Sequence, residues 1–348
     1  MPSRRPTIDD VAALAGVARV TVSRVLNGNP NVRQEVRDRV QKSVDMLQYK
    51  VNLQARSLAG GQLHMLAMVY ASDVDSEPNS FYQSGLELGA LRACTEQGFQ
   101  LLMQAVDQND AGSSARVLEL IQTRRCDGLI LTPPFSDDLD LLTEIAGRKF
   151  PVVCISAGEA SQAISSGVRI DDAEAGYDLT RYLLGLGHRR FGFLQGLEAH
   201  LSANQRFAGF LRALAEHGLG EDAYAVAQGN FTFHSGVTLT PHLLAAPCKP
   251  SVIVCANDDM AVGAMFIAHK MGLDIPKDIS IVGFDDTPVS EIIWPPLTTV
   301  HHPLKAIGYK AAAMVMERIT GGGAAETVRT ELVPYRLVAR ESAAAPKD

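Results

Sequence analysis

The chain has 348 residues, of which 46% are hydrophobic and 20% are charged, a composition that excludes wholesale disorder and leaves room for more than one domain. Its apolar runs are much shorter than the roughly 20 residues of a membrane-spanning helix, and no secretory signal is recognised, so a cytoplasmic protein is expected. Residues 1–61 carry a formal charge of +5, which leaves −12 for the rest of a chain whose total is −7. A basic segment on an acidic body is typical of a polyanion-binding module joined to a second domain, although basic residues can also simply solvate helix faces.

The first predicted element is a helix over residues 8–15. Thr7 can cap it, and Asp9 and Asp10 suit its positive end. Gly16 ends it. Its apolar positions, at helical spacing, are Ile8, Val11, Ala12 and Ala15.

A second short helix is predicted from about Val20 to Leu26 and a third from about Arg33 to Leu47. Two short helices joined by a tight turn that contains glycine match the helix-turn-helix geometry, which presents its second helix to the major groove of DNA. The third helix completes a small all-α core.

The sequence from Thr7 to Asn27, T-I-D-D-V-A-A-L-A-G-V-A-R-V-T-V-S-R-V-L-N, with V-R-Q-E-V-R-D-R-V and Tyr49 after it, resembles the headpiece of the lactose-repressor/galactose-repressor family of bacterial regulators. The resemblance implies that Arg19 and Val20 meet base edges and that Arg24 reaches a base or a phosphate. It also implies that the DNA backbone is held by Thr7, Thr21, Ser23 and Asn27.

The headpiece departs from the family pattern at two places. The family usually has serine where this chain has Ala18, and Tyr-x-Pro-Asn where this chain has Tyr49-Lys50-Val51-Asn52. Both changes remove local order, but neither removes a group that reads bases.

Residues 51–61 resemble the hinge helix of the same family, which folds when two copies pack in the minor groove. By that resemblance Leu58 wedges a base step, and the DNA-contacting residues of the segment are Asn52, Ala55 and Leu58. Ten residues are too few for an isolated helix to persist in water, so folding on DNA is reasonable. A plain linker is the alternative, but it explains only Gly60 and Gly61.

Beyond His64 short apolar runs alternate with helical stretches, a pattern that predicts parallel sheets flanked by helices. The predicted strands are 65–70, 99–103, 128–132, 152–156, 191–194, 252–256 and 279–283. The predicted helices lie near 80–97, 112–124, 138–147, 174–186, 203–217, 257–271 and 304–320. These strand–helix units are too many for a single sheet. We therefore expect two parallel-sheet, Rossmann-like α/β lobes.

The motifs G-H-R-R-F-G-F-L, R-F-A-G-F, A-N-D-D-M-A-V-G-A, I-S-I-V-G-F-D-D-T and P-P-L-T-T-V resemble the sugar-binding core of the same family, which is itself similar to periplasmic sugar-binding proteins. This resemblance implies that the chain crosses back between lobes near residue 300. The expected domains are a headpiece (1–50), a hinge (51–61), an N-terminal lobe (62–163 with 303–331), a C-terminal lobe (164–302 with 332–340) and a disordered tail (341–348).

Ligands of open parallel sheets bind beyond the carboxyl ends of the strands. Carried over by resemblance, the polar core of the effector site is Arg206, Asn257 and Asp285, whose donors and acceptors suit a polyol. Further acceptors are expected from Ser72, Asp73 and Asp171. Aromatic faces are expected from Phe81, Tyr82, Phe231 and Trp294. Asn257 could also cap a helix, as an additional role, and Phe81 or Tyr82 could be core.

His301 and His302 are adjacent and lack a further ligand at metal-binding spacing, so no metal and no cofactor are expected. The chain has no nucleophile elbow, phosphate loop, dinucleotide fingerprint or zinc-protease motif, so no enzyme is expected either. The sequence predicts a repressor that binds a near-palindromic operator as a homodimer and responds to a sugar. A regulator that responds to a nucleobase and a carbohydrate transport protein are the alternatives.

Overall fold

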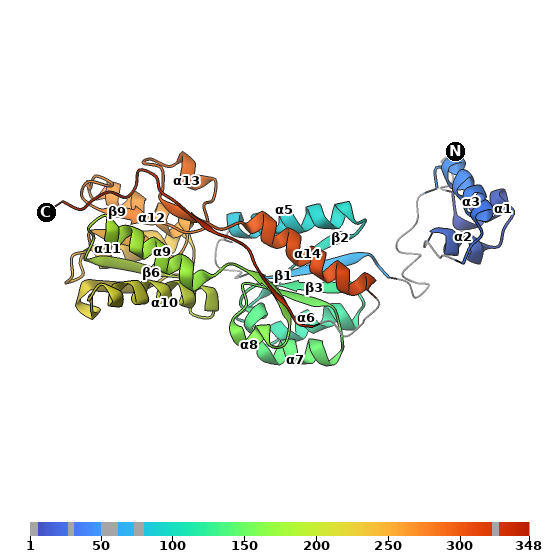
Figure 1. The fold of residues 1–348 in the computed structure, drawn as a ribbon, viewed down its shortest axis with the longest axis horizontal. Coiled ribbons are helices and arrows are strands. Elements are labelled where there is room, and N and C mark those ends of the chain that lie inside the picture. Colours follow the sequence, from blue (N-terminus) through green and yellow to red (C-terminus); the bar gives the residue numbers. More distant parts are fainter. Residues whose placement is uncertain (1–5, 27–30, 50–61, 73–79, 322–326, 348) are drawn as a thin grey trace. The chain divides into compact units, whose positions relative to one another are not determined.

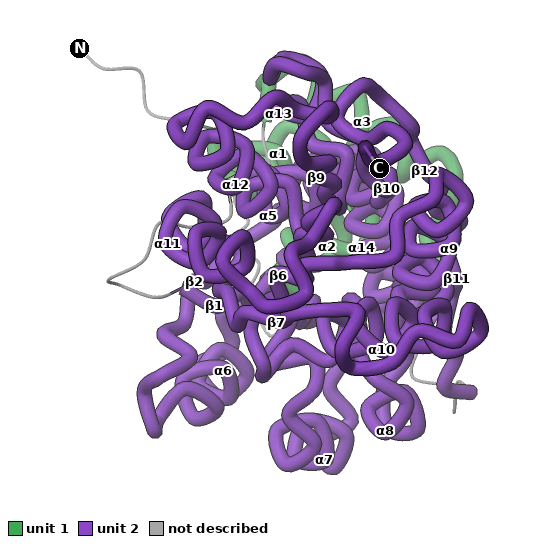
Figure 2. The backbone as a smooth tube through the Cα atoms, turned by 90° about the vertical axis from the view of Figure 1, so that its left-hand side faces the viewer, with its two compact units in different colours: residues 1–63 green, residues 64–348 purple. Residues whose placement is uncertain are grey.

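The computed structural model describes all residues except 1–5, 27–30, 50–61, 73–79, 322–326 and 348. The chain divides into two compact units, residues 1–63 and residues 64–348 (Figure 2).

The first unit contains three helices, α1 (Ile8–Ala15), α2 (Arg19–Leu26) and α3 (Gln34–Leu47). Thr7 caps α1 in a reciprocal capping box with Asp10, and Gly16 ends α1 in the left-handed conformation. The three helices enclose a small core whose buried members are Val11, Ala12, Ala15, Val22, Val25 and Val40. The predicted helix-turn-helix unit is confirmed, with bounds that differ from the predicted ones by no more than one residue.

The first lobe of the second unit is a six-stranded parallel sheet in the order β11-β5-β4-β3-β1-β2. Its strands are β1 (Met65–Ser72), β2 (Gln100–Asp107), β3 (Gly128–Leu131), β4 (Val152–Ile155), β5 (Ser166–Arg169) and β11 (Thr330–Leu332). Its helices are α5 (Ser80–Glu96), α6 (Ser113–Gln122), α7 (Leu139–Gly147), α8 (Glu159–Gln162) and α14 (Leu304–Thr320). Helices α5 and α14 cover one face of the sheet, and α6, α7 and α8 lie on the other (Figure 1).

The second lobe is a four-stranded parallel sheet in the order β7-β6-β8-β9. Its strands are β6 (Phe191–Gln195), β7 (Tyr224–Gln228), β8 (Val252–Cys255) and β9 (Ser280–Val282). Its helices are α9 (Asp172–Gly185), α10 (Leu201–Glu216), α11 (Phe233–Leu244), α12 (Asp258–Lys270) and α13 (Val289–Ile292). A short antiparallel pair, β10 (Thr299–His301) with β12 (Arg336–Val338), lies beside it. The expected architecture of two parallel-sheet lobes is confirmed.

The chain crosses between the lobes three times, after β5, before α14 and after β11. The predicted boundary at residues 163 and 164 is wrong, because Ser166–Arg169 pairs with β4 and β11 in the first sheet. The return into the first lobe at residue 303 agrees with the structure. The last crossing follows Leu332, which pairs with Arg169, rather than residue 331.

The predicted disorder of residues 341–348 is also wrong for the part that the structure describes. Ser342 is fully buried, and its hydroxyl donates to the Ile281 carbonyl oxygen at 2.6 Å and accepts from the Thr298 amide at 2.8 Å. The Lys347 amine lies 2.6 Å from an Asp278 oxygen. These are backbone and polar contacts, so the segment adds to the second lobe without any apolar periodicity in its sequence.

Helices α9 and α10 pack through glycines. A Cβ atom on Gly176 would collide with the backbone oxygen of Arg206, and one on Gly209 would collide with that of Ala173. This close approach places Arg206 against the N-terminal end of α9. In the part of the chain that the structure describes, no helix is long and apolar enough to cross a membrane.

Candidate functional site

The exposed side of α2 is the candidate DNA-reading surface of the first unit. The Arg19 side chain is 67% exposed, Val20 is 56% exposed, and Arg24 is exposed as well. Thr21 and Ser23 are half-buried. Arg19 Nε lies 3.8 Å from Asp9 Oδ1 on α1, a solvent-exposed pair that holds the guanidinium only weakly. The side chains expected to meet bases are thus free to do so.

The other predicted DNA contacts divide into two groups. The Thr7 hydroxyl accepts from the Asp10 amide and donates to the Asp10 carboxylate, so it already serves the α1 cap. Asn27, Asn52, Ala55 and Leu58 lie outside the described residues, as does the whole predicted hinge.

Ala18 precedes α2 and gives it an incomplete cap. Its carbonyl oxygen accepts from the Thr21 amide at 2.8 Å and the Val22 amide at 3.2 Å, but its methyl group can accept nothing. Replacing Ala18 with serine should stabilise the first unit by about 1 kcal/mol by adding a side-chain acceptor. Hydrogen exchange of the α2 amides measures this effect as slower exchange.

The control for this substitution is Ala13→Ser, at an exposed position inside α1. Serine there has lower helix propensity and no cap to complete, so exchange should become slightly faster. Equal effects of the two substitutions would contradict the capping argument.

A cavity of about 360 Å³ lies between the two lobes of the second unit. The first lobe contributes Met68, Tyr70, Ala71, Ser72, Tyr82, Gln83, Leu86, Gln108, Thr132 and Pro133. The second lobe contributes Leu197, His200, Ser202, Arg206, Asn230, Phe231, Thr232 and Asp285. Most of these residues follow the carboxyl ends of strands or begin the next helix, which is where open parallel sheets bind ligands.

Five of the predicted effector residues line this cavity: Ser72, Tyr82, Arg206, Phe231 and Asp285. Asp73 lies outside the described residues. The structure therefore brings together residues separated by more than two hundred positions in the sequence.

Four predicted effector residues do not line the cavity. Asn257 is buried, and its side chain caps α12 through the Met260 amide and donates to the Phe231 carbonyl oxygen at 2.8 Å. Asp171 caps α9 through the Glu174 amide. Phe81 is 39% exposed and Trp294 is 75% exposed. Asn257 thus supports the backbone of Phe231 instead of facing a ligand.

Arg206 is held rigidly at the base of the cavity. Its Nε donates to Asp172 Oδ1 at 2.8 Å and its Nη1 donates to the Ala256 carbonyl oxygen at 2.7 Å, and both charged side chains are buried. The guanidinium lies over the Phe284 ring, 3.7 Å from its centroid. Neither bond uses Nη2, which is left as a donor for a ligand.

Asp285 presents a carboxylate to the cavity from a strained backbone. Its φ is 108°, which places it in the left-handed region that side chains rarely adopt. His302 Nδ1 lies 3.1 Å from Asp285 Oδ1, and the imidazole is buried. The carboxylate is thereby fixed by a residue on the chain segment that crosses between the lobes.

Phe231 and His200 form an aromatic wall that sequence reasoning found only in part. Phe231 has a φ of 67°, and its ring lies so close to Gly196 that no side chain fits there. The two rings are 5.4 Å apart. Burial lowers the pKa of His200 to about 4, so the imidazole is neutral, and its buried Nε2 has no partner among the described residues. Burial also raises the pKa of the Tyr82 phenol, which stays protonated.

The lining residues that sequence reasoning missed include Tyr70, Gln108, His200, Asn230 and Thr232. Gln108 directly follows β2, but the predicted strand ended at residue 103, so the strand-end rule did not reach it. His200 is the N-cap residue of α10. Asn230 and Thr232 follow β7, a partly exposed edge strand that its apolar pattern does not reveal.

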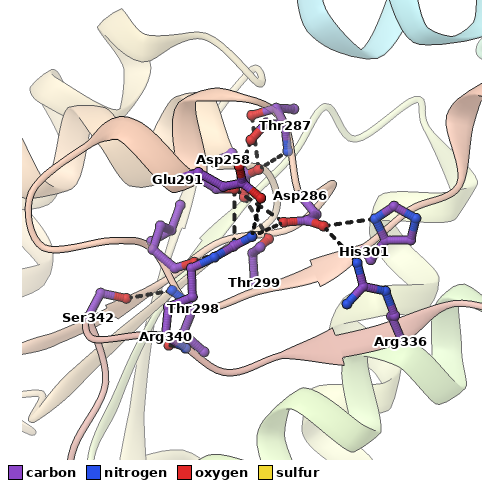
Figure 3. A network of polar contacts seen from close by, with 12 residues as sticks. Asp258, Asp286, Thr287, Glu291, Thr298, Thr299, His301, Arg336, Arg340 and Ser342 are labelled. Carbon is purple, nitrogen blue, oxygen red and sulfur yellow. Dashed lines mark hydrogen bonds and ion pairs between the residues drawn. The ribbon is translucent and has the colours of Figure 1, made fainter.

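A polar network lies behind the site, around Asp258 and Asp286 (Figure 3). Asp286 Oδ1 accepts from Arg340 at 2.7 Å, and Asp286 Oδ2 lies 2.8 Å from His301 Nδ1. Asp258 accepts from the Thr287 amide and from the Thr299 hydroxyl. His301 and His302 thus pair with different carboxylates, and no group of three metal-binding side chains exists among the described residues.

Comparison with known families gives two matches. Residues 7–52 match the model of bacterial regulatory proteins of the lacI family. Residues 180–343 match the periplasmic binding protein-like domain.

Individual proteins match over nearly the whole chain. Catabolite control protein A of Priestia megaterium is 33% identical over 97% of this chain and 98% of its own length. A solved complex of the transcriptional regulator CelR with cellobiose is 30% identical, with a TM-score of 0.71 over 97% of this chain and 100% of that one. The Lac repressor dimer bound to operator and the anti-inducer ONPF is 26% identical, with a TM-score of 0.81 over 98% of this chain and 100% of that one.

Proposed function

Because this chain belongs to the lacI family of bacterial regulatory proteins, we propose that it represses carbohydrate-utilisation genes and that a small sugar in the cavity controls its binding to an operator. That it is a DNA-binding transcription regulator follows from the family. The gene class and the effector are the proposal. The cavity is the observation that supports this proposal, because polar groups from both lobes converge there between aromatic rings.

The chemistry of the cavity suits a polyol. The Asp285 carboxylate can accept from vicinal hydroxyls while Arg206 Nη2 donates to them. The rings of Tyr82 and Phe231 can pack against the C–H surface of a sugar. The CelR complex, which contains cellobiose, supports a carbohydrate ligand for this chain as well. A nucleobase is the second candidate, since aromatic rings and amides also suit a flat heterocycle.

We expect two copies of the chain to act together. Exposed large apolar side chains on the second unit indicate a covered surface: Leu88, Leu91, Phe233, Phe266, Ile292 and Trp294. Helices α5, α11 and α12 carry four of them, and Figure 2 shows α11 beside α12. The Lac repressor structure is a dimer on its operator, which supports a homodimer on a near-palindromic site.

The proposed mechanism links the cavity to DNA through the lobes. A sugar that contacts both lobes favours one lobe orientation over another, because it binds the two orientations with different affinity. The lobe orientation would then set the pairing of residues 51–61 of the two copies in the minor groove.

The test starts from duplexes selected from a random library by the full-length chain. We expect gel shifts with near-palindromic duplexes, weaker shifts with a single half-site, and a change in affinity with members of a panel of sugars and nucleobases. Affinity should fall steeply with salt, because phosphate contacts release counterions. Insensitivity to salt, or retention of duplexes without half-sites, would refute the proposal.

Replacing Arg19 with alanine should weaken binding to the selected duplex by about 1–3 kcal/mol per half-site and relax its sequence preference at one position. The reason is that a guanidinium at the start of α2 can bond guanine with two hydrogen bonds. Lys42→Ala on the exposed face of α3 is the matched control. It removes the same charge, so any loss should be uniform across sequences. Uniform loss in both variants would contradict base reading by Arg19.

A further inference from the structure

The side chains that line the cavity offer little positive charge, although one of them is an arginine. Arg206 and Asp285 are the only charged side chains among its described lining residues, since the lining histidine His200 is neutral. The first lobe contributes hydroxyl, amide, aromatic and aliphatic groups only. Among the described lining residues, a ligand anion therefore has one candidate cation, Arg206.

That cation is already neutralised within the protein. Arg206 Nε lies 2.8 Å from Asp172 Oδ1, and both side chains are buried at 6% and 1% exposure. A buried ion pair has little attraction left for a second anion, because the field of one charge cancels most of the field of the other. Arg206 can thus donate a hydrogen bond through Nη2 without offering a free positive charge.

Among the described residues, Asp285 pairs with the His302 imidazole and with no lysine or arginine, so its carboxylate leaves negative charge at the cavity wall. Its carboxylate faces the cavity, and Asp258 and Asp259 begin the helix behind it. Burial is the main cause that raises the pKa of Asp259 to about 6, and the neighbouring Asp285 carboxylate adds to it by repulsion. An anionic group placed beside Asp285 would meet the same repulsion.

We propose that the cavity takes an uncharged polyhydroxylated ligand and rejects the carboxylate and phosphate forms of the same sugars, with Asp172 as the residue that sets this preference through Arg206. This inference rests on the proposed function, because it specifies the ligand of the same cavity. Asp172 acts as a positioning residue, since it touches Arg206 and does not line the cavity.

The first experiment needs no variant. Isothermal titration of the full-length chain compares matched probes: glucose with glucuronate and glucose 6-phosphate, galactose with galacturonate, and cellobiose. At least one neutral sugar should bind, and its anionic partner should bind at least ~100-fold more weakly, because repulsion between unit charges about 4 Å apart is strong near a protein surface. Equal or tighter binding of an anionic form overturns the inference but leaves a sugar-controlled regulator in place.

The second experiment removes the negative charge that pairs with Arg206. Asp172→Asn keeps a hydrogen-bond acceptor for Arg206 Nε but removes the compensating charge, so binding of the anionic partner should improve by at least ~10-fold relative to the neutral sugar. Asp171→Asn is the matched control. It removes the adjacent carboxylate while asparagine preserves the α9 cap, so the ratio of the two dissociation constants should not change.

The outcomes are distinguishable. An unchanged ratio in Asp172→Asn, or the same change in Asp171→Asn, overturns the role of Asp172. Binding of no sugar by a chain that still shifts duplex DNA overturns the inference of a polyol ligand. Loss of the DNA shift itself would instead contradict the proposed function. If Asp172→Asn does not fold, the ratio of dissociation constants measured for the anionic and neutral sugars with the unsubstituted chain still tests the ligand preference.

Discussion

Replacing Arg206 with alanine should lower the free energy of unfolding of the second unit by about 3–5 kcal/mol and remove its response to ligand. The substitution leaves the Asp172 carboxylate buried without a partner, which costs far more than the intact pair contributes. It also removes the donor that the cavity offers through Nη2. The second unit holds most of the helical residues, so circular dichroism during urea unfolding measures the effect.

The same pair of helices supplies the control. Arg212 on α10 pairs with Glu174 on α9, but both side chains are nearly half exposed. Arg212→Ala should therefore change stability by no more than about 1 kcal/mol. The double variant Arg206→Ala with Asp172→Ala should recover part of the lost stability, because no unpaired charge remains. Equal costs for Arg206→Ala and Arg212→Ala would contradict the buried-pair argument.

Replacing Asp286 with asparagine should cost about 3 kcal/mol at neutral pH and flatten the acid limb of the stability curve. Asp286 accepts from Arg340, and the two side chains are only 8% and 14% exposed. His301 and Arg336 approach its second oxygen. Asparagine keeps the shape of the side chain but loses the negative charge that pairs with Arg340 and Arg336.

The direction of the pH effect follows from the pKa. Burial raises the pKa of Asp286, but the hydrogen bonds from Arg340 and His301 outweigh it, so the pKa lies below its usual value. A depressed pKa contributes stability that is present above the unfolded value of about 4 and is lost as the pH falls through the folded value. Urea midpoints measured between pH 7 and pH 3 should therefore fall less steeply in Asp286→Asn.

Substitutions of two other carboxyl groups serve as controls for the general effect of acid on stability. Burial and Asp285 raise the pKa of Asp258 well above its usual value, so its contribution has the opposite sign and Asp258→Asn should keep the acid limb. The exposed Asp278 bonds Lys347, and Asp278→Asn should leave the acid limb almost unchanged, since water screens that pair. An unchanged acid limb in Asp286→Asn would contradict the assignment.

Edge strands and short segments are where prediction from sequence was incomplete. The strand Tyr224–Gln228 is partly exposed along its length, and the helix Phe233–Leu244 after it contains Pro241, so neither was predicted. Ser166–Arg169 is a four-residue strand with a glycine. Each is stabilised by pairing with a neighbouring strand or by packing on its sheet, which a local pattern does not record.

The sequence by itself determined the headpiece and the alternation of strands and helices. Thr7, Gly16 and the apolar positions of α1 act over a few residues, so caps and periodicity specify those elements almost completely. Buried parallel strands such as Val252–Cys255 can be predicted equally well from the sequence, because both of their faces must be apolar.

Only the tertiary structure decided which polar residues at the strand ends face the ligand. Asp285 and Asn257 both follow buried strands, yet Asp285 lines the cavity while the Asn257 side chain is used by a helix cap and by the Phe231 backbone. The partner that neutralises Arg206 and the burial of Ser342 were likewise outside the reach of the sequence. A local pattern shows that a polar group is present, but the hydrogen bonds that distant segments offer it decide whether it remains available to a ligand.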